Sequence, residues 1–204
     1  MNIPFARRAF SLRFRRRYHA CAQRFRESRG HSLIELLTVV CLMGVLATVA
    51  VPAMSSMMGS LQLTSTTNGF FSHILLARSE AIKRNSRVAL CKSSDGISCA
   101  AAGGWEQGWI VFHDVNNNGS REDTEPIMQR ELALPASLRL TGNLNVAHYV
   151  SFASTGAAKL VGGGFQAGTL TVCQYSAGGS MVRQIVLNAA GRPRVQKGSA
   201  VSCD

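Results

Sequence analysis

The sequence predicts an α+β protein in which one long N-terminal, transmembrane helix packs on an antiparallel β-sheet head. An uncharged run from Leu36 to Ala53 is about long enough to cross the hydrocarbon core of a bilayer as a helix. Beyond Arg87, short runs rich in β-branched and aromatic residues are separated by Gly, Asn, Ser and Pro. No second helical pattern follows Arg87, so we expect the one helix to pack on antiparallel strands.

The helix is expected to continue well past the uncharged run, over residues 33–85. Apolar side chains recur at helical spacing in residues 70–84, which predicts an amphipathic segment. Glycines in residues 59–69 predict a softer zone between the two parts. The strands expected after the helix are Val88–Lys92, Gly108–His113, Pro126–Leu132, Leu138–Thr141, Tyr149–Ala153, Thr169–Tyr175, Met181–Asn188 and Arg192–Gln196.

Most of the positive charge lies before the uncharged run. Residues 1–30 hold nine arginines and one acid, whereas the rest of the chain holds 13 basic and 10 acidic side chains. Basic residues before an apolar span keep that end in the cytoplasm. A nucleic-acid-binding arm is the alternative interpretation of these arginines. A secretory signal is disfavoured, because no cleavage signal follows the apolar run.

Glu35 is the one carboxylate at the start of the uncharged run. An acid that enters lipid is costly, so it is a functional candidate by default. Because a buried charge needs an opposite charge, we expect a cation to pair with Glu35. The alternative is an ordinary membrane anchor with one misplaced acid.

The stretch GHSLIELL resembles the class III signal of type IV pilins and pseudopilins. The matching positions are Gly30, Leu33, Ile34, Glu35, Leu36 and Leu37, with Pro52 where such helices usually kink and His31 where Phe is usual. The resemblance implies cleavage by a prepilin peptidase between Gly30 and His31, followed by methylation of the new N-terminus. It also implies that Glu35 pairs with the α-amino group of a neighbouring subunit.

The resemblance and the composition together predict four segments. They are a prepilin leader, residues 1–30; a transmembrane or filament-core helix, residues 31–54; an amphipathic continuation of that helix, residues 55–87; and a β-rich head with a basic C-terminal tail, residues 88–204. The expected location is the bacterial inner membrane, with a single span and the head in the periplasm. Assembly into a pilus would bring the head to the cell surface.

Four cysteines fall in the predicted head: Cys91, Cys99, Cys173 and Cys203. An even number beyond a bilayer indicates two disulfides in an oxidising compartment, and four cysteines allow three pairings. We favour Cys91–Cys99, which closes a short loop, and Cys173–Cys203, which ties down the last residues. The chain-entropy model assigns them about 2.5 and 3.5 kcal/mol. A zinc site is the alternative, although no CxxC or nearby His spacing supports it.

Several features together resemble the FimT branch of the FimT/GspH minor pilin family. They are the Cys-loop-Cys unit, Trp105 to Trp109 (WEQGW), Cys173, Gly191 to Arg194 (GRPR) and Cys203. The resemblance implies a type IV pilin-like fold, other pilin subunits as partners, and non-specific DNA binding through GRxR during natural transformation. The alternative is a GspH-like pseudopilin, or a structural or priming subunit of a type IV pilus or type II secretion pseudopilus, with no DNA-binding role.

The GRPR stretch itself suits a phosphate-binding edge strand. Pro193 biases Arg192 toward extended geometry, in which residues two apart point to one face about 6.6 Å apart. Arg192 and Arg194 would then span about two phosphate steps of roughly 3.4 Å each and contact the DNA backbone without reading bases. The alternative is a solvated edge strand whose arginines deter aggregation.

Other residues are expected to support this strand. Pro193 lacks an N–H, which predicts an edge position, and Gly191 permits the preceding turn. Lys197 and Arg183 would extend the basic patch. Tyr175 is the only aromatic residue close to the tail in sequence. We therefore expect phosphate-led, salt-sensitive and largely sequence-independent binding.

The segment DVNNNGSREDTE satisfies the EF-hand calcium-loop pattern. The candidate ligands are Asp114, Asn116, Asn118, Ser120 and Glu125. The preceding residues 109–113 read as a strand rather than a helix, and two ligand positions are neutral Asn. The alternative is a polar hairpin loop. Any Ca²⁺ site is expected to be weak, and no other cofactor is expected.

Catalysis is not expected. His73, His113 and His148 lie in different segments, and no nucleophile–base spacing or phosphate-cradling motif occurs.

The acidic and basic residues are unevenly divided along the head: residues 95–131 carry seven acids and two bases, whereas residues 132–204 carry six bases and one acid. This division predicts that the C-terminal half faces a polyanion or an acidic neighbouring subunit.

Overall fold

The structure is a computed structural model that describes residues 30, 32–175, 180–198 and 203. The chain divides into two compact units, residues 1–44 and residues 45–204. Of the predicted leader and its cleavage site, only Gly30 falls within the described residues, so His31 and the leader arginines lie outside them.

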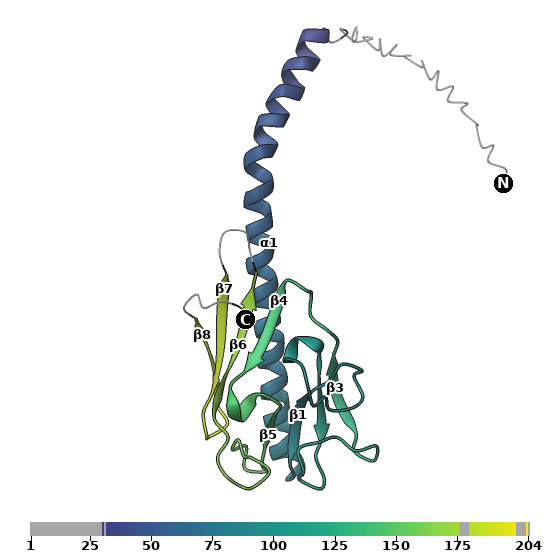
Figure 1. Ribbon diagram of the computed structural model, residues 1–204, viewed down its shortest axis with the longest axis vertical. Helices are drawn as coiled ribbons and strands as arrows, with labels where there is room; N and C mark the ends of the chain where they lie inside the picture. Colours follow the sequence, from purple (N-terminus) through teal and green to yellow (C-terminus); the bar gives the residue numbers. More distant parts are fainter. Residues whose placement is uncertain (1–29, 31, 176–179, 199–202, 204) are drawn as a thin grey trace, which may run out of the picture. The chain divides into compact units, whose positions relative to one another are not determined.

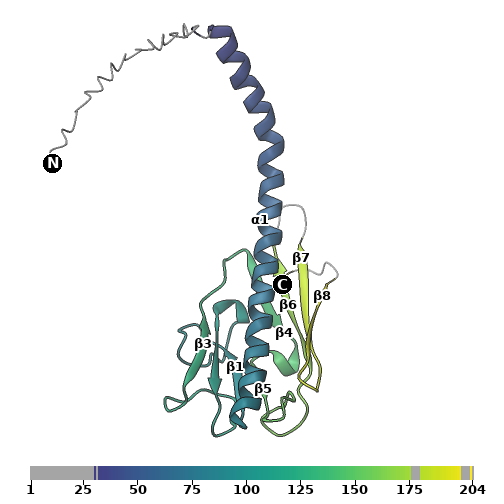
Figure 2. The same ribbon diagram turned by 180° about the vertical axis from the view of Figure 1, so that it is seen from behind.

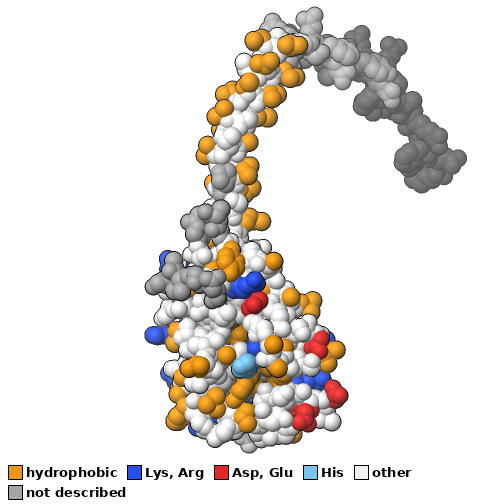
Figure 3. Space-filling view, in the orientation of Figure 1, with side chains coloured by type: hydrophobic (Ala, Val, Ile, Leu, Met, Phe, Trp, Pro, Cys, Tyr) orange, Lys and Arg blue, Asp and Glu red, His pale blue; other side chains and the backbone are white. Residues whose placement is uncertain are grey.

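A single helix, α1 (Leu33–Arg84), accounts for the predicted helical segments (Figure 1). It is continuous through Pro52 and through residues 59–69, where a softer zone was expected. Among the described residues it is the one helix that is long and apolar enough to cross a membrane, judged by length and composition. Large apolar side chains on its first half are exposed, as Figure 3 shows, and such a surface needs lipid or other helices to cover it.

The head contains two four-stranded antiparallel sheets, in the orders β3-β2-β1-β5 and β4-β6-β7-β8. The strands are β1 (Val88–Lys92), β2 (Trp109–His113), β3 (Ile127–Glu131), β4 (Leu138–Gly142), β5 (Tyr149–Phe152), β6 (Gly168–Gln174), β7 (Met181–Leu187) and β8 (Pro193–Lys197). Every predicted strand is present, with each end within one residue of its predicted position. The predicted α+β class, with a long helix packed on an antiparallel head, is therefore confirmed. The division into two sheets was not predicted.

The core of the head lies where the C-terminal half of α1 crosses both sheets (Figure 2). The ring of Phe70 on α1 meets the rings of Trp105 and Trp109 edge to face, with centroids 5.2 and 4.8 Å away. Trp105 Nε1 donates a hydrogen bond to the Val146 carbonyl at 3.0 Å, and Trp109 Nε1 donates to His73 Nδ1 at 2.9 Å. The Trp-x-x-Gly-Trp motif therefore joins the helix to the head.

Protonation of His73 is expected to destabilise the head. Burial lowers the pKa of His73 below its ordinary value of 6.5, and the charge of Glu131 opposes this shift only in part. His73 Nδ1 must stay unprotonated to accept the hydrogen bond from Trp109 Nε1. Near pH 6.5 the unfolded chain thus binds more protons than the native one, so stability falls as the pH falls through that value.

Thermal unfolding measured between about pH 8 and pH 5 tests this expectation. His73→Gln keeps a hydrogen-bond acceptor without a titrating ring, so its melting temperature should fall less over this range than that of the wild type. Parallel loss of stability in both proteins would show that other groups cause the acid sensitivity.

Candidate nucleic-acid interface

The GRPR stretch forms the end of a tight turn and the start of an edge strand. β8 is the outermost strand of its sheet and pairs with β7, which confirms the edge position predicted from Pro193. Gly191 has a φ of +74°, and its N–H donates to the Asn188 carbonyl at 2.9 Å. The Asn188 side-chain oxygen accepts the backbone N–H of Arg192 at 2.9 Å. The turn is therefore held by backbone and side-chain hydrogen bonds.

Close packing fixes this turn against the rest of the head. A Cβ atom on Gly191 would collide with the carbonyl oxygen of Gly156 and lie 3.2 Å from the backbone nitrogen of Ala158. The same Gly156 carbonyl accepts a hydrogen bond from Arg78 Nε of α1 at 3.0 Å. The role of Arg78 at this turn was not evident from the sequence, because Arg78 lies more than one hundred residues before it.

Arg192 and Arg194 are both exposed. Arg192 belongs to the turn, just before β8 begins, and Arg194 is the second residue of the strand. Among the described residues, neither guanidinium has a carboxylate within ion-pair distance. Figure 3 shows acidic side chains toward the β3 side of the head and basic ones along the β8 edge. Both arginines are thus free to bind an anion.

The structure does not bring Arg183 and Lys197 onto the same surface as Arg194. They are cross-strand partners of each other, and Arg183 shares its strand face with the buried Ile185. Lys197 is three residues after Arg194, an odd number, so the two side chains point to opposite faces of the sheet. With Ser60 and Leu63 of α1, among others, Arg183 and Lys197 line a separate hollow of about 350 Å³.

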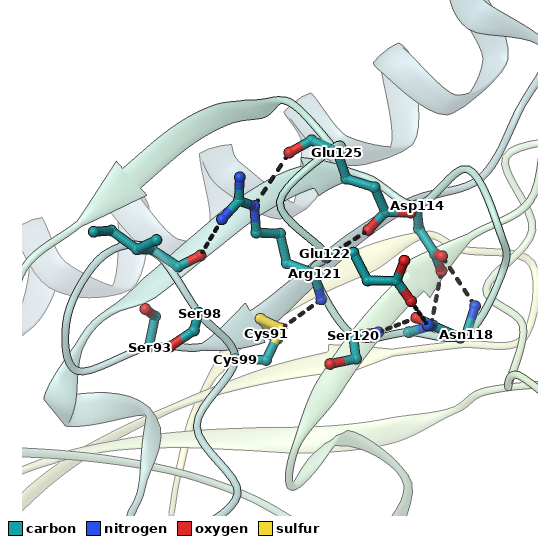
Figure 4. Close-up of a disulfide and its surroundings, with 12 residues drawn as sticks. Cys91, Ser93, Ser98, Cys99, Asp114, Asn118, Ser120, Arg121, Glu122 and Glu125 are labelled. Atoms are coloured by element: carbon teal, nitrogen blue, oxygen red, sulfur yellow. Dashed lines mark hydrogen bonds between the residues drawn. A yellow bond between two sulfur atoms is a disulfide. The ribbon is translucent and has the colours of Figure 1, made fainter.

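The segment predicted as a calcium loop, residues 114–125, is held together by hydrogen bonds between its own side chains and backbone (Figure 4). The two carboxylate oxygens of buried Asp114 accept the backbone N–H groups of Asn118 and Gly119, each at 3.0 Å. Those of Glu125 accept Val115 N at 2.7 Å and Glu122 N at 3.0 Å. Burial raises the pKa of Asp114, since these hydrogen bonds offset only part of its desolvation.

The remaining loop positions follow the same pattern. The side-chain oxygen of Asn116 accepts Asn118 N at 3.1 Å, and that of Asn118 accepts Ser120 N at 2.8 Å. Within the described residues, no group of three or more His, Cys, Asp or Glu side chains is placed to hold a metal ion. The arrangement is that of a polar loop built on Asx turns.

Both favoured disulfides are formed in the structure. Cys91–Cys99 closes the loop after β1, and Figure 4 shows its surroundings, where Arg121 N contacts the sulfur of Cys99. Cys173–Cys203 ties the C-terminal tail to β6. Tyr175 Oη also donates to the Cys203 carbonyl at 2.8 Å.

Of the three histidines among the described residues, His73 and His113 use their rings in hydrogen bonds within the fold, and His148 contributes its backbone carbonyl. His73 accepts the hydrogen of Trp109, and the His113 ring hydrogen-bonds with Ser86 Oγ at 2.6 Å. His148 contributes its carbonyl to the backbone N–H of Lys92 at 3.3 Å.

Residues 66–191 match the family model described as Type II transport protein GspH. The chain belongs to the GspH family. As a GspH-family chain it is a minor pilin or pseudopilin of a type IV pilus or of a type II secretion system, and it assembles with other pilin subunits. The family is one of structural pilin and pseudopilin subunits. The apolar N-terminal helix of this chain, α1, fits anchoring in the inner membrane.

Two solved structures are similar to this GspH-family chain. The type IV minor pilin FimU of Pseudomonas aeruginosa is 18% identical over 69% of this chain and 91% of its own, with a TM-score of 0.49. The minor pseudopilin EpsH from the type 2 secretion system of Vibrio cholerae is 14% identical over 67% of this chain and 97% of its own, with a TM-score of 0.46. No curated protein matches the sequence significantly.

Proposed function

We propose that this GspH-family chain is a minor pilin that binds DNA non-specifically through Arg192 and Arg194 and supports DNA uptake during natural transformation. The observation that carries the proposal is the pair of exposed guanidiniums on a fixed turn and edge strand, without a carboxylate partner among the described residues. An arginine fork matches the oxygens of a phosphate and gains strength from the opposite charge. A surface that contacts only phosphates does not distinguish sequences.

The edge of a sheet is a suitable place for such contacts. In the described part of the chain no strand pairs with the outer side of β8, so a DNA backbone can approach its side chains and main chain there. The turn is tied to Asn188 and packs against Gly156, so little backbone conformational entropy is lost when a phosphate binds.

The rest of the proposal concerns how the head reaches its ligand. A prepilin peptidase would cut between Gly30 and His31, and the mature chain would stay in the inner membrane with its head in the periplasm. Glu35 lies at the start of α1, where the N-terminal amine of a neighbouring subunit would neutralise it. Assembly into a pilus would then expose the head at the cell surface.

A second function is favoured by the family description. A chain matched as a type II transport protein would serve as a structural or priming subunit of a pseudopilus, without a ligand of its own. Its exposed apolar helix surface suits packing against other subunits equally well. In that case Arg192 and Arg194 would act as edge protection or as contacts between subunits.

Replacing Arg192 and Arg194 together with glutamine is expected to weaken DNA binding by about 30-fold or more, because two charge-assisted contacts are lost. The negative slope of log affinity against log salt should also become less steep by about 1.8, since two fewer phosphate contacts release counterions. Fluorescence anisotropy of the full chain in neutral detergent, with a labelled duplex at several salt concentrations, measures both quantities.

The matched control is Arg130→Gln with Arg139→Gln, which removes the same charge from β3 and β4. This control should bind DNA nearly as well as the wild type. If the Arg192/Arg194 variant binds DNA normally but filaments fail to assemble, the structural-subunit function is correct and the DNA-binding proposal is wrong.

A further inference from the structure

An exposed aromatic ring lies in a short hairpin beside the arginine turn. Lys159 and Phe165 form an isolated antiparallel bridge at the base of this hairpin. Phe165 is 65% exposed, which is unusual for a phenylalanine, and the ammonium of Lys159 lies 4.0 Å from its ring centroid. Lys159 Nζ also donates to the Gly163 carbonyl at 3.3 Å, which helps to hold the charge near the ring.

The hairpin is anchored on both sides. At its tip, the Val161 N–H donates to Tyr149 Oη of β5 at 3.0 Å. At its end, Gln166 is fully buried: its amide nitrogen donates to the carbonyls of Asn145 and Tyr149 at 2.8 and 2.9 Å, and its oxygen accepts Ser151 N at 2.9 Å. Gln166, the residue next to Phe165, is therefore fixed by three side-chain hydrogen bonds, so the backbone that carries the Phe165 ring is held in place.

The chain that leads into this hairpin packs against the arginine turn. Gly191 packs against the backbone of Ala158, and Lys159 is the next residue. Figures 1 and 2 both place the β7–β8 turn and the β5–β6 connection at the same end of the head. The hairpin and the turn are more than 20 residues apart in sequence, so closeness along the chain indicated Tyr175 and not Phe165.

The guanidinium of Arg87 borders the hairpin. Arg87 donates to Ser151 Oγ at 3.0 Å and to the Lys159 carbonyl at 3.4 Å, and its Nε donates to Asn117 at 3.2 Å. All three hydrogen-bond partners are neutral acceptors, and the guanidinium also interacts through space with the opposing charge of the buried Asp114 carboxylate. The guanidinium lines a polar cleft of about 310 Å³, together with Asn85, Ser86, Val115, Asn117, Ala153 and Ser154.

We propose that Phe165 stacks an unpaired nucleobase, and that Lys159 and Arg87 contact the adjoining phosphates. The ligand is therefore single-stranded DNA, bound in preference to an intact duplex. An aromatic ring next to cations is the arrangement that binds single strands without sequence preference, because every base has a π face. In a duplex those faces are covered by neighbouring base pairs, so the ring finds no partner. This inference rests on the proposed DNA-binding function of the same end of the head.

Phe165→Ala is expected to weaken binding of a single-stranded oligothymidylate by between about five-fold and 150-fold. Binding of a blunt duplex of the same length should change by less than about two-fold, since the phosphate contacts remain. Phe165→Tyr keeps the ring and should retain single-strand affinity. Leu144→Ala removes another highly exposed apolar side chain and should change neither affinity. All variants are measured by anisotropy on the full chain in neutral detergent.

The outcomes separate this inference from the function on which it rests. If Phe165→Ala leaves single-strand binding unchanged, or weakens both DNA forms equally, the stacking proposal is overturned, and contact with a neighbouring subunit becomes the role of the ring. If the Arg192/Arg194 variant keeps wild-type duplex affinity while Phe165→Ala loses single strands, the arginine turn is not the duplex site and the stacking proposal stands. If the wild type binds neither DNA form at low salt, both proposals are overturned.

Discussion

Replacing Gly191 with alanine is expected to lower the stability of the head by about 3 kcal/mol or more. A φ of +74° is unfavourable for alanine, and its Cβ would collide with the Gly156 carbonyl oxygen, which is backbone and cannot move aside alone. A shift of Gly156 would also disturb the hydrogen bond from Arg78. The melting temperature should fall by roughly 6 to 12 °C for a chain of this size, and DNA affinity should fall with it because Arg192 is displaced.

The matched control is Gly162→Ala, where a Cβ would meet nothing within 4 Å. That variant should melt within about 2 °C of the wild type, the range expected of a change below about 0.5 kcal/mol. Equal melting temperatures for the two variants would contradict the close packing of the turn on Gly156.

Removing the Cys173–Cys203 disulfide by alanine substitution is expected to destabilise the head by about 3.5 kcal/mol. The bond closes a segment with a sequence separation of 30 residues and, with Val182, forms a small buried cluster on β6 and β7. Alanine is preferred to serine, because a buried hydroxyl would add a desolvation penalty. Thermal or urea unfolding under oxidising conditions gives the size of the loss.

The comparison variant removes Cys91–Cys99, whose sequence separation is 8 residues. The shorter loop predicts a smaller loss of about 2.5 kcal/mol. If the two variants are destabilised in the opposite order, the loop-closure explanation is wrong for this head, and local packing around the bonds must dominate.

Much of the fold was predictable because its signals are local. Runs rich in β-branched and aromatic residues, and the turn residues between them, located the strands to within one residue. Pro193 correctly indicated an edge strand, because a residue without an N–H cannot donate a hydrogen bond to a neighbouring strand. The two-sheet division was not predictable in this way, since it depends on which strands pair.

The candidate site was predicted only in part, for the same reason. Arg192 and Arg194 lie two residues apart in a recognisable motif. The β5–β6 connection, which carries Phe165, reaches the same end of the head through folding alone. Lys197 was wrongly assigned to the same patch as Arg194. The two residues are three positions apart on β8, and side chains at an odd separation point to opposite faces of a sheet. Contacts between Gly191 and Gly156 leave no trace in the sequence beyond two glycines.

Hydrogen–deuterium exchange of the full chain, with and without a short duplex at low salt, tests the central claim most directly. The outward amides of an edge strand exchange readily, so a bound DNA backbone should slow exchange in peptides that cover residues 188–197. We predict this protection in the wild type and its loss in the Arg192→Gln/Arg194→Gln variant. DNA binding that protects other peptides and leaves residues 188–197 unchanged would contradict the account.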